Sequence, residues 1–176
     1  FYVPTQYATA IAAPTTLAPD PTRKQFFENR EQAVHSLYAY VYVCDKYEGL
    51  ILIGAGTLLD GNPLNNFLER ALTYNPDGIL DGARNITIVG TYAYICADAG
   101  LVVVDLADPL KPQITSIVGE PNVKKPRSVA VQFRYAYVCD EEGVKVLDVT
   151  DLAKPVAKSM IRLPEAKSVY LARTYA

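Results

Sequence analysis

The sequence has 176 residues, of which half are hydrophobic and a fifth are charged, and its formal net charge is −2. This length and composition are typical of a folded domain with a sizeable core. The charge gives no electrostatic reason to expect nucleic acid or an anionic membrane as a partner, and no apolar run reaches the length of a membrane span.

The first 31 residues predict an N-terminal arm or linker. They are rich in Pro, Thr and Ala and become charged between residues 23 and 30. The chain starts at Phe1 without a signal-peptide pattern and stops at Ala176 inside an expected strand pair. We therefore expect both ends to continue in a longer polypeptide.

A first strand-rich unit is expected over residues 32–83, starting at Gln32. Aromatic and aliphatic runs at residues 40–45 and 49–53 are separated by a short polar turn, which is the pattern of paired strands. His35 falls in the expected first strand of this unit. Because it stands alone, without a companion nucleophile or metal-ligand set, we interpret it as a structural residue.

An insertion after Ile53 predicts a short helix on the rim of this unit. Asn62 is a suitable N-cap and Pro63 suits the first helical position. Apolar residues follow at helical spacing, at Leu64, Phe67, Leu68, Ala71 and Leu72. We predict a contact surface for a partner at Phe67, Glu69 and Arg70; the alternative is that the helix only covers a sheet edge.

The insertion also carries side-chain oxygens of the kind that bind calcium. These belong to Asp60, Asn62, Asn65, Asn66 and Asp77. Their spacing differs from that of an EF-hand loop, and the same residue types make turns. We therefore predict no metal site and no cofactor.

Two later segments repeat one another. Residues 92–105 and 135–148 share a pattern that recurs 43 positions apart, at Cys96 and Cys139, Gly100 and Gly143, Asp105 and Asp148, and Pro112 and Pro155. The unit starts align at Gln32, Arg84, Arg127 and Lys167. They divide the chain into units 32–83, 84–126 and 127–166 and a truncated fourth unit, 167–176.

Each unit contains four short runs of β-branched and aromatic residues separated by Gly, Pro and Asp. A single four-stranded unit leaves its apolar faces exposed, and stacking such units around an axis buries them. We predict an all-β fold, a partial β-propeller of about three four-stranded blades, with the helical insertion after the third strand of the first blade. A β-sandwich is the main alternative, but its strands would not repeat as a four-strand block.

The segment Gly100-Leu101-Val102-Val103-Val104-Asp105, with the following Leu-Ala-Asp-Pro, resembles the core of the LVIVD repeat, and residues 143–149 match it nearly as well. The first unit departs from the pattern, since Gly54 stands where Asp105 and Asp148 stand later. The resemblance covers residues 32–176 and implies a β-propeller. Many proteins of this family look secreted or surface-associated, so it also implies an extracytoplasmic location, in the periplasm, on the cell surface or outside the cell.

Three basic residues, Arg84, Arg127 and Lys167, precede the first strands of their units. Because the first strand of a blade lines the central channel, these cations are candidates for binding an anion or an acidic partner loop. The alternative is that each pairs with an acid of a neighbouring blade.

Two further sets of residues recur in register, and we interpret both as structural. Cys44, Cys96 and Cys139 sit among Tyr, Val and Ile residues and are expected to pack in the core rather than to form disulfides. Asp105, Asp108, Asp148 and Asp151 stand beside turns and are expected to cap them.

No catalytic constellation is visible, so we lean against an enzyme. The pattern best fits a non-catalytic extracytoplasmic scaffold that binds a protein partner. One alternative is a propeller docked on a multihaem cytochrome or another redox partner. A second is a hydrolase or lyase at the channel mouth, using Arg84, Arg127 and His35. In each case we expect the remaining blades to come from the same longer chain.

Overall fold

The computed structural model describes residues 2–14, 35–59 and 63–172. They form three antiparallel four-stranded sheets. The first sheet contains β1 (Ala8–Ala12), β2 (Tyr40–Asp45), β3 (Gly49–Gly54) and β4 (Glu69–Tyr74); the second contains β5 (Asn85–Val89), β6 (Tyr92–Ala97), β7 (Gly100–Asp105) and β8 (Gln113–Val118); the third contains β9 (Ser128–Gln132), β10 (Tyr135–Cys139), β11 (Gly143–Asp148) and β12 (Val156–Arg162).

Helical structure in the described residues is limited to short 3-10 turns. These are η1 (Ser36–Ala39), η2 (Gly56–Leu59), η3 (Pro63–Asn65) and η4 (Pro76–Gly78). The chain is therefore all-β, as predicted.

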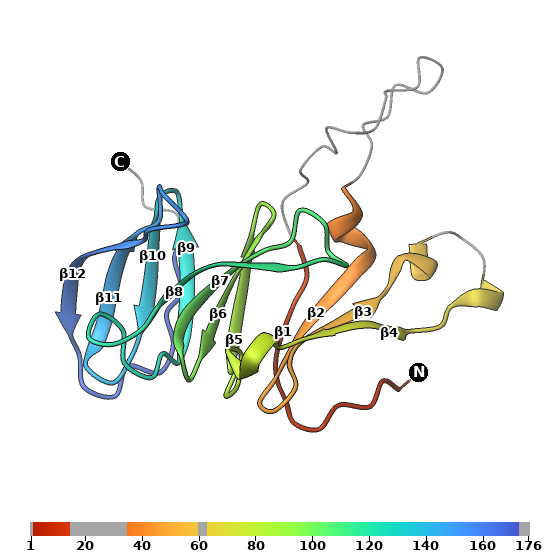
Figure 1. The fold of residues 1–176 in the computed structure, drawn as a ribbon, viewed down its shortest axis with the longest axis horizontal. Coiled ribbons are helices and arrows are strands. Elements are labelled where there is room, and N and C mark those ends of the chain that lie inside the picture. Colours follow the sequence, from red (N-terminus) through yellow and green to blue (C-terminus); the bar gives the residue numbers. More distant parts are fainter. Residues whose placement is uncertain (1, 15–34, 60–62, 173–176) are drawn as a thin grey trace, which may run out of the picture.

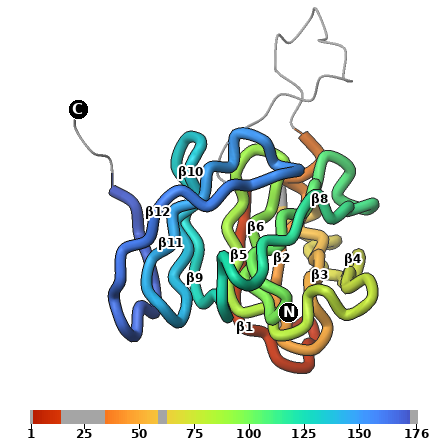
Figure 2. The backbone as a smooth tube through the Cα atoms, turned by 60° about the vertical axis from the view of Figure 1, so that its left-hand side comes forward, coloured from red at the N-terminus to blue at the C-terminus, as the bar shows by residue number. Residues whose placement is uncertain are grey.

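The three sheets lie side by side in sequence order, face against face (Figures 1 and 2). Within each sheet the four strands follow one another from the inside outwards, and the innermost strands β1, β5 and β9 contact their counterparts in the next sheet. Four-stranded units stacked in this way form part of a β-propeller, and each sheet is one blade.

The same irregularity recurs in every blade. The pairing of the third with the fourth strand shifts register between Leu52 and Ile53, between Val103 and Val104, and between Val146 and Leu147. A β-bulge bends and twists the strand that carries it. The outer strand of each blade is thus turned at the same place, as expected for copies of one unit.

Two apolar cores hold the blades together. One fills the space between the first and second blades and includes Tyr42, Leu52, Ile86 and Ile95. The other fills the space between the second and third blades and includes Tyr94, Leu101, Val138 and Leu147. Because side chains alternate between the two faces of a strand, the central blade buries both of its faces.

The inner strand of the first blade is not where the sequence placed it. The aligned unit start, Gln32, lies outside the described residues, and the inner strand is β1, inside the segment predicted to be an arm. His35 accordingly is not in a strand; its Nδ1 accepts a hydrogen bond from the Leu37 N–H at the start of η1. The run Ala-Thr-Ala-Ile-Ala lacks a strong strand pattern, and its partner β2 lies far along the chain, so local sequence does not reveal the pairing.

The predicted helix over residues 64–72 is also wrong. Among the described residues, the short turns η2 and η3 follow the third strand, and residues 69–74 form β4. The apolar spacing of this segment fits a helix, but residues 69–74 form hydrogen bonds with the free edge of β3 instead. Their side chains then alternate between the two faces of the sheet. Tertiary pairing overrode the local periodicity.

The described part of the truncated fourth unit, residues 167–172, contains no strand. Residues 163–172 leave β12 and return to β9, where the Val169 N–H donates a 3.4 Å hydrogen bond to Ser128 Oγ. The chain there follows the path of a next inner strand without a second strand beside it.

Candidate functional site

The arginines predicted to line the channel connect successive units. The Arg84 and Arg127 N–H groups donate to the carbonyls of Cys96 and Cys139, at 2.9 and 2.7 Å. The Arg84 side chain forms an ion pair with Asp98 and donates from Nη1 to the Pro126 carbonyl at 3.3 Å. Arg84 therefore has an acidic partner in its own blade, in the turn between β6 and β7, and a carbonyl partner in the following unit.

Arg127 repeats the second of these contacts. Its Nη1 donates to the Ala166 carbonyl at 3.5 Å, and Ala166 precedes Lys167 as Pro126 precedes Arg127. Lys167 is exposed. The two arginines thus each reach the residue before the next basic position. This geometry supports a role in joining blades, and anion binding by the three residues stays a prediction.

A buried charge cluster lies beside the turn between β10 and β11, and the sequence interpretation missed it. The Asp140 carboxylate accepts hydrogen bonds from the N–H groups of Glu142, Gly143 and Lys124, at 2.8, 3.0 and 3.1 Å. The buried Lys145 ammonium lies 3.7 Å from Asp140 and pairs with Glu142. Hydrogen bonds from Lys145 and Lys124 lower the pKa of Glu142 to about 2.

The repeat contained a signal for this cluster. Lys145 and Asp140 stand where the second blade has Val102 and Ala97, 43 positions earlier. A charged pair replacing two apolar residues in an otherwise regular repeat indicates a buried ion pair. Every carboxylate oxygen of Asp140 has a partner, so the cluster stabilises the turn rather than offering a reactive group.

The aspartates beside the outer turns cap them, as predicted. Asp105, Asp108, Asp148 and Asp151 each accept a hydrogen bond from the backbone N–H two residues further on, at 2.8 to 3.2 Å. This is the Asx-turn geometry.

The three cysteines are free and buried. Burial raises the pKa of the Cys44 thiol to about 12, and it also raises the pKa values of Cys96 and Cys139. Because the thiolate is the reactive form, these thiols are poor nucleophiles at neutral pH. The interpretation of the cysteines as core residues is confirmed.

The described residues contain no cluster of acidic side chains that could bind calcium. Asp60 and Asn62 lie outside them, and across residues 2–14, 35–59 and 63–172 no group of three His, Cys, Asp or Glu side chains is arranged to hold a metal ion. Near Asp77 the Asn75 side chain binds the Leu80 N–H and Asp81, which are turn contacts.

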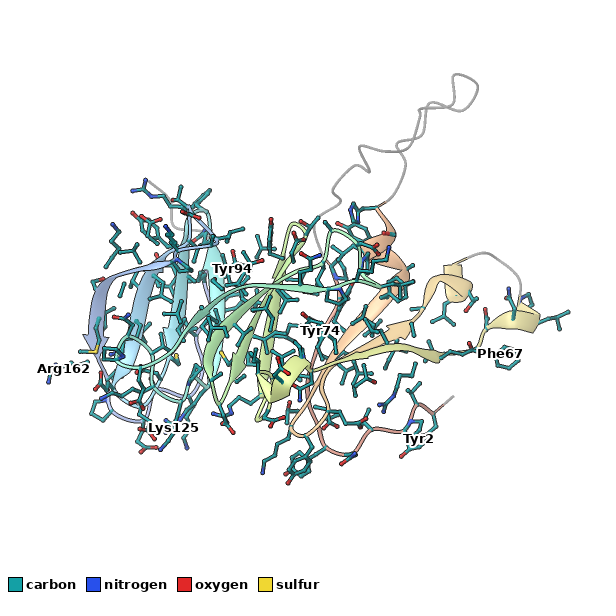
Figure 3. All side chains as sticks on the ribbon, in the orientation of Figure 1. Tyr2, Phe67, Tyr74, Tyr94, Lys125 and Arg162 are labelled. Atoms are coloured by element: carbon teal, nitrogen blue, oxygen red, sulfur yellow. The ribbon has the colours of Figure 1, made fainter. Side chains whose placement is uncertain are left out.

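The insertion of the first blade forms a projecting rim loop, described at residues 55–59 and 63–68, beside a hollow of about 520 Å³. Phe67 lies at the far end of this projection (Figure 3) and is 57% exposed, and Leu64 is 85% exposed. Gly54 and Gly56 help to line the hollow together with Tyr40, Thr57 and Glu69. The loop therefore presents apolar side chains next to a cavity.

The predicted contact surface of the insertion divides into two parts. Phe67 and Glu69 line the hollow. Arg70 instead pairs with Glu48 and donates to the Pro4 carbonyl, while Glu48 also accepts from the Gln6 N–H at 3.0 Å. Arg70 thereby fastens the N-terminal residues to the first blade and does not belong to the rim surface.

The fold and the repeated inter-blade contacts define a repeat protein of the β-propeller class. The LVIVD repeat matches residues 82–119 and 125–161, which span the second and third blades. The second and third blades are therefore LVIVD repeats, and this is consistent with an LVIVD-repeat protein. No curated protein matches it closely, and no helix of the described residues is long and apolar enough to cross a membrane.

Proposed function

We propose that this chain is a non-catalytic scaffold that binds another protein through the rim loop, residues 55–59 and 63–68. The observation that carries the proposal is the exposure of Leu64 and Phe67 beside the hollow lined by Tyr40 and Gly54. Aromatic and aliphatic side chains next to a pocket are typical of the centre of a protein interface. The second and third blades, which follow the repeat closely, have no such loop.

The chemistry of the loop indicates the kind of partner. The small or apolar residues that line the hollow are Ala39, Tyr40, Gly54, Gly56 and Phe67, and the polar ones are Thr57, Asn65 and Glu69. A protein surface with one apolar side chain and a neighbouring basic or hydrogen-bonding group would fill it. We propose that this partner is met outside the cytoplasm, as the family resemblance implies; cell fractionation that recovers the native protein from the cytosol would contradict this location.

The residues that an enzyme would need are already engaged. Arg84 is paired with Asp98, and His35 Nδ1 accepts a backbone hydrogen bond. These contacts favour the scaffold over the hydrolase or lyase alternative. Docking on a multihaem cytochrome stays a prediction, and haem absorbance in the natively purified assembly is the measurement that addresses it.

The test replaces the exposed apolar residues of the rim loop. Native partners are cross-linked and quantified by mass spectrometry for the wild type, for the double variant Leu64→Asp with Phe67→Asp, and for the control Leu110→Asp. Leu110 is 49% exposed on the turn between β7 and β8, so it matches the chemistry of the replaced residues in a different blade. We expect the double variant to lose a partner roughly ten-fold or more, the effect of removing an interface anchor, while the control keeps it.

Circular dichroism of all three proteins shows whether the fold is retained. Equal recovery of every partner by the folded double variant would show that the rim loop is not the binding surface.

A further inference from the structure

The turn between β9 and β10 presents a phenylalanine in a backbone conformation that favours glycine (Figure 2). Phe133 is the first of the two turn residues, since Gln132 pairs with Tyr135, and its φ is +55°. A two-residue hairpin turn with a positive φ at its first position has glycine there as a rule. The second blade follows this rule, because Gly90, 43 positions earlier, has a φ of +59°.

The fold fixes this turn in the same way in both blades. In the third blade the Arg134 carbonyl accepts a hydrogen bond from the Val149 N–H at 2.8 Å, and in the second blade the Thr91 carbonyl accepts one from the Leu106 N–H at 2.7 Å. These partners also stand 43 positions apart. Phe133 therefore adopts the positive φ at a cost that glycine avoids, because its Cβ atom crowds the backbone in this conformation.

The Phe133 side chain does not offset this cost by packing. It is 91% exposed, so it adds almost no buried apolar surface. The exposure does not come from the end of the chain. The second blade has a neighbour on each face, yet a Cβ atom built at Gly90 meets no atom of the described residues within 4 Å. A strained, exposed aromatic residue in place of a glycine is typical of a contact site for another molecule.

Beside Phe133, an arginine is held in position for an acidic group. The Arg134 guanidinium lies over the Tyr135 ring, 5.0 Å from its centroid, and Nη2 donates to the Tyr135 hydroxyl at 2.8 Å. Among the described residues no acid forms an ion pair with Arg134; Asp148, which pairs with Tyr135 in the sheet, accepts from Thr150 Oγ1 at 2.7 Å. Stacking orders the arginine side chain, and its remaining N–H groups suit a carboxylate.

The local charges favour a protein partner over a lipid surface. Lys158 lies 3.8 Å from Asp148, and Asp151 adds a second carboxylate in the turn that follows β11, so Arg134 is not part of a basic patch. Binding to an anionic membrane needs several uncompensated cations and a broad apolar face, and one aromatic ring beside one arginine supplies neither. Aromatic and arginine side chains are instead enriched among the anchors of protein interfaces.

We propose that the turn between β9 and β10 is a binding surface at which Phe133 enters an apolar pocket of a protein partner and Arg134 pairs with a carboxylate at the edge of that pocket. Glycine suits the turn better, and the aromatic ring is present for the contact. The surface goes beyond the rim loop of the first blade and does not depend on it, so each proposal can fail without the other.

The contact is tested by photo-crosslinking in the cells that make the protein. The residue at position 133 is replaced by p-benzoylphenylalanine, and the adducts are identified by mass spectrometry. We expect one protein adduct whose cross-linked peptide lies beside Asp or Glu residues. Arg134→Glu should reduce this adduct roughly ten-fold or more, because it places two carboxylates together. Arg162→Glu is the charge-matched control, since Arg162 is exposed at the opposite end of the same blade and should leave the adduct unchanged.

A second measurement separates the contact from the fold. Phe133→Gly introduces the residue of the second blade, so we expect a thermal midpoint equal to or above that of the wild type. Recovery of the cross-linked protein in a pull-down should fall roughly ten-fold or more with this variant.

Four outcomes would overturn the proposal. A thermal midpoint several degrees lower for Phe133→Gly would mean that the ring serves the fold. Adducts confined to lipid would identify a membrane as the occupant. The other two are an adduct no stronger than that from p-benzoylphenylalanine at position 110, on the exposed turn of the second blade, and an adduct that Arg134→Glu leaves intact.

Discussion

At the scale of single residues, buried carboxylates organise the turns between the second and third strands. Asp45 in the first blade and Asp140 in the third are fully buried, and each accepts three backbone N–H groups. The second blade has Ala97 at this place and manages without the carboxylate. The acidic residue is thus a local solution for a turn and not a requirement of the repeat.

We expect the contribution of Asp45 to stability to depend on pH. Burial works to raise the pKa of Asp45, but hydrogen bonds from the N–H groups of Tyr47, Tyr7 and Glu48 outweigh it and lower the pKa below its ordinary value. A carboxyl group whose pKa is lower in the folded state stabilises the fold above its unfolded-state pKa of about 4, and this stabilisation is lost as the pH falls through the folded-state value.

The measurement is urea unfolding of the wild type and Asp45→Asn at pH 7 and pH 3. The variant should lower the free energy of unfolding by about 1–3 kcal/mol at pH 7, because the hydrogen bonds to the charged acceptor are weakened. The difference should shrink at pH 3. A difference that is the same at both values would show that the charge of Asp45 has no part in holding the turn.

At the scale of elements, the turns between the second and third strands set how closely the chain can approach the fourth. Gly100 has a φ of +124°, and a Cβ atom built there would lie 2.3 Å from the Val118 carbonyl oxygen of β8. Gly143 repeats this arrangement against Ile161. Only glycine fits where the third strand begins, because the obstacle is backbone and cannot rotate away.

Gly100→Ala should therefore destabilise the protein strongly, by about 3 kcal/mol, through backbone strain and the clash with β8. Gly90→Ala is the matched control, since Gly90 has a φ of +59° with open space around it and should cost only about 1 kcal/mol. Thermal unfolding of both variants compares the two costs. Equal losses would mean that the contact with β8 does not matter.

The contrast between the second and first blades shows how far sequence reasoning reaches at this scale. A short turn joins β6 to β7, and another joins β10 to β11, so the pairing within each of these two pairs follows from neighbouring residues. The spacing of the apolar residues in β4 predicts a helix but is also compatible with a strand. The strand forms because the free edge of β3 is available for pairing. Because residues 69–74 form β4, Arg70 lies beside Glu48 and Pro4 and holds the N-terminal residues.

At the scale of the whole molecule, the blades differ in how many of their faces are buried. The second blade is covered on both faces, whereas the third is covered on one. In a repeat array each unit is stabilised by its own contacts and by its neighbours. The blade with fewer neighbours should open more readily.

Hydrogen exchange of the 176-residue chain should show this gradient. We expect the amides of β6 and β7 to exchange most slowly and those of β11 and β12 faster, since β12 is largely exposed. Uniform exchange across the three blades would instead indicate that the array unfolds as a single cooperative unit.

The sequence by itself determined the repeat, the four-stranded unit, the buried cysteines and the aspartate caps, because these depend on residues close together along the chain. Only the tertiary structure decided that β1 completes the first blade, that Arg84 and Arg127 join successive units, and that Lys145 is buried with Asp140. The pairing of β1 with β2 and the two arginine contacts link segments distant in the sequence, and their stability comes from pairing and burial in the assembled array. Lys145 and Asp140 lie close together in the sequence, but their burial is decided by the surrounding fold.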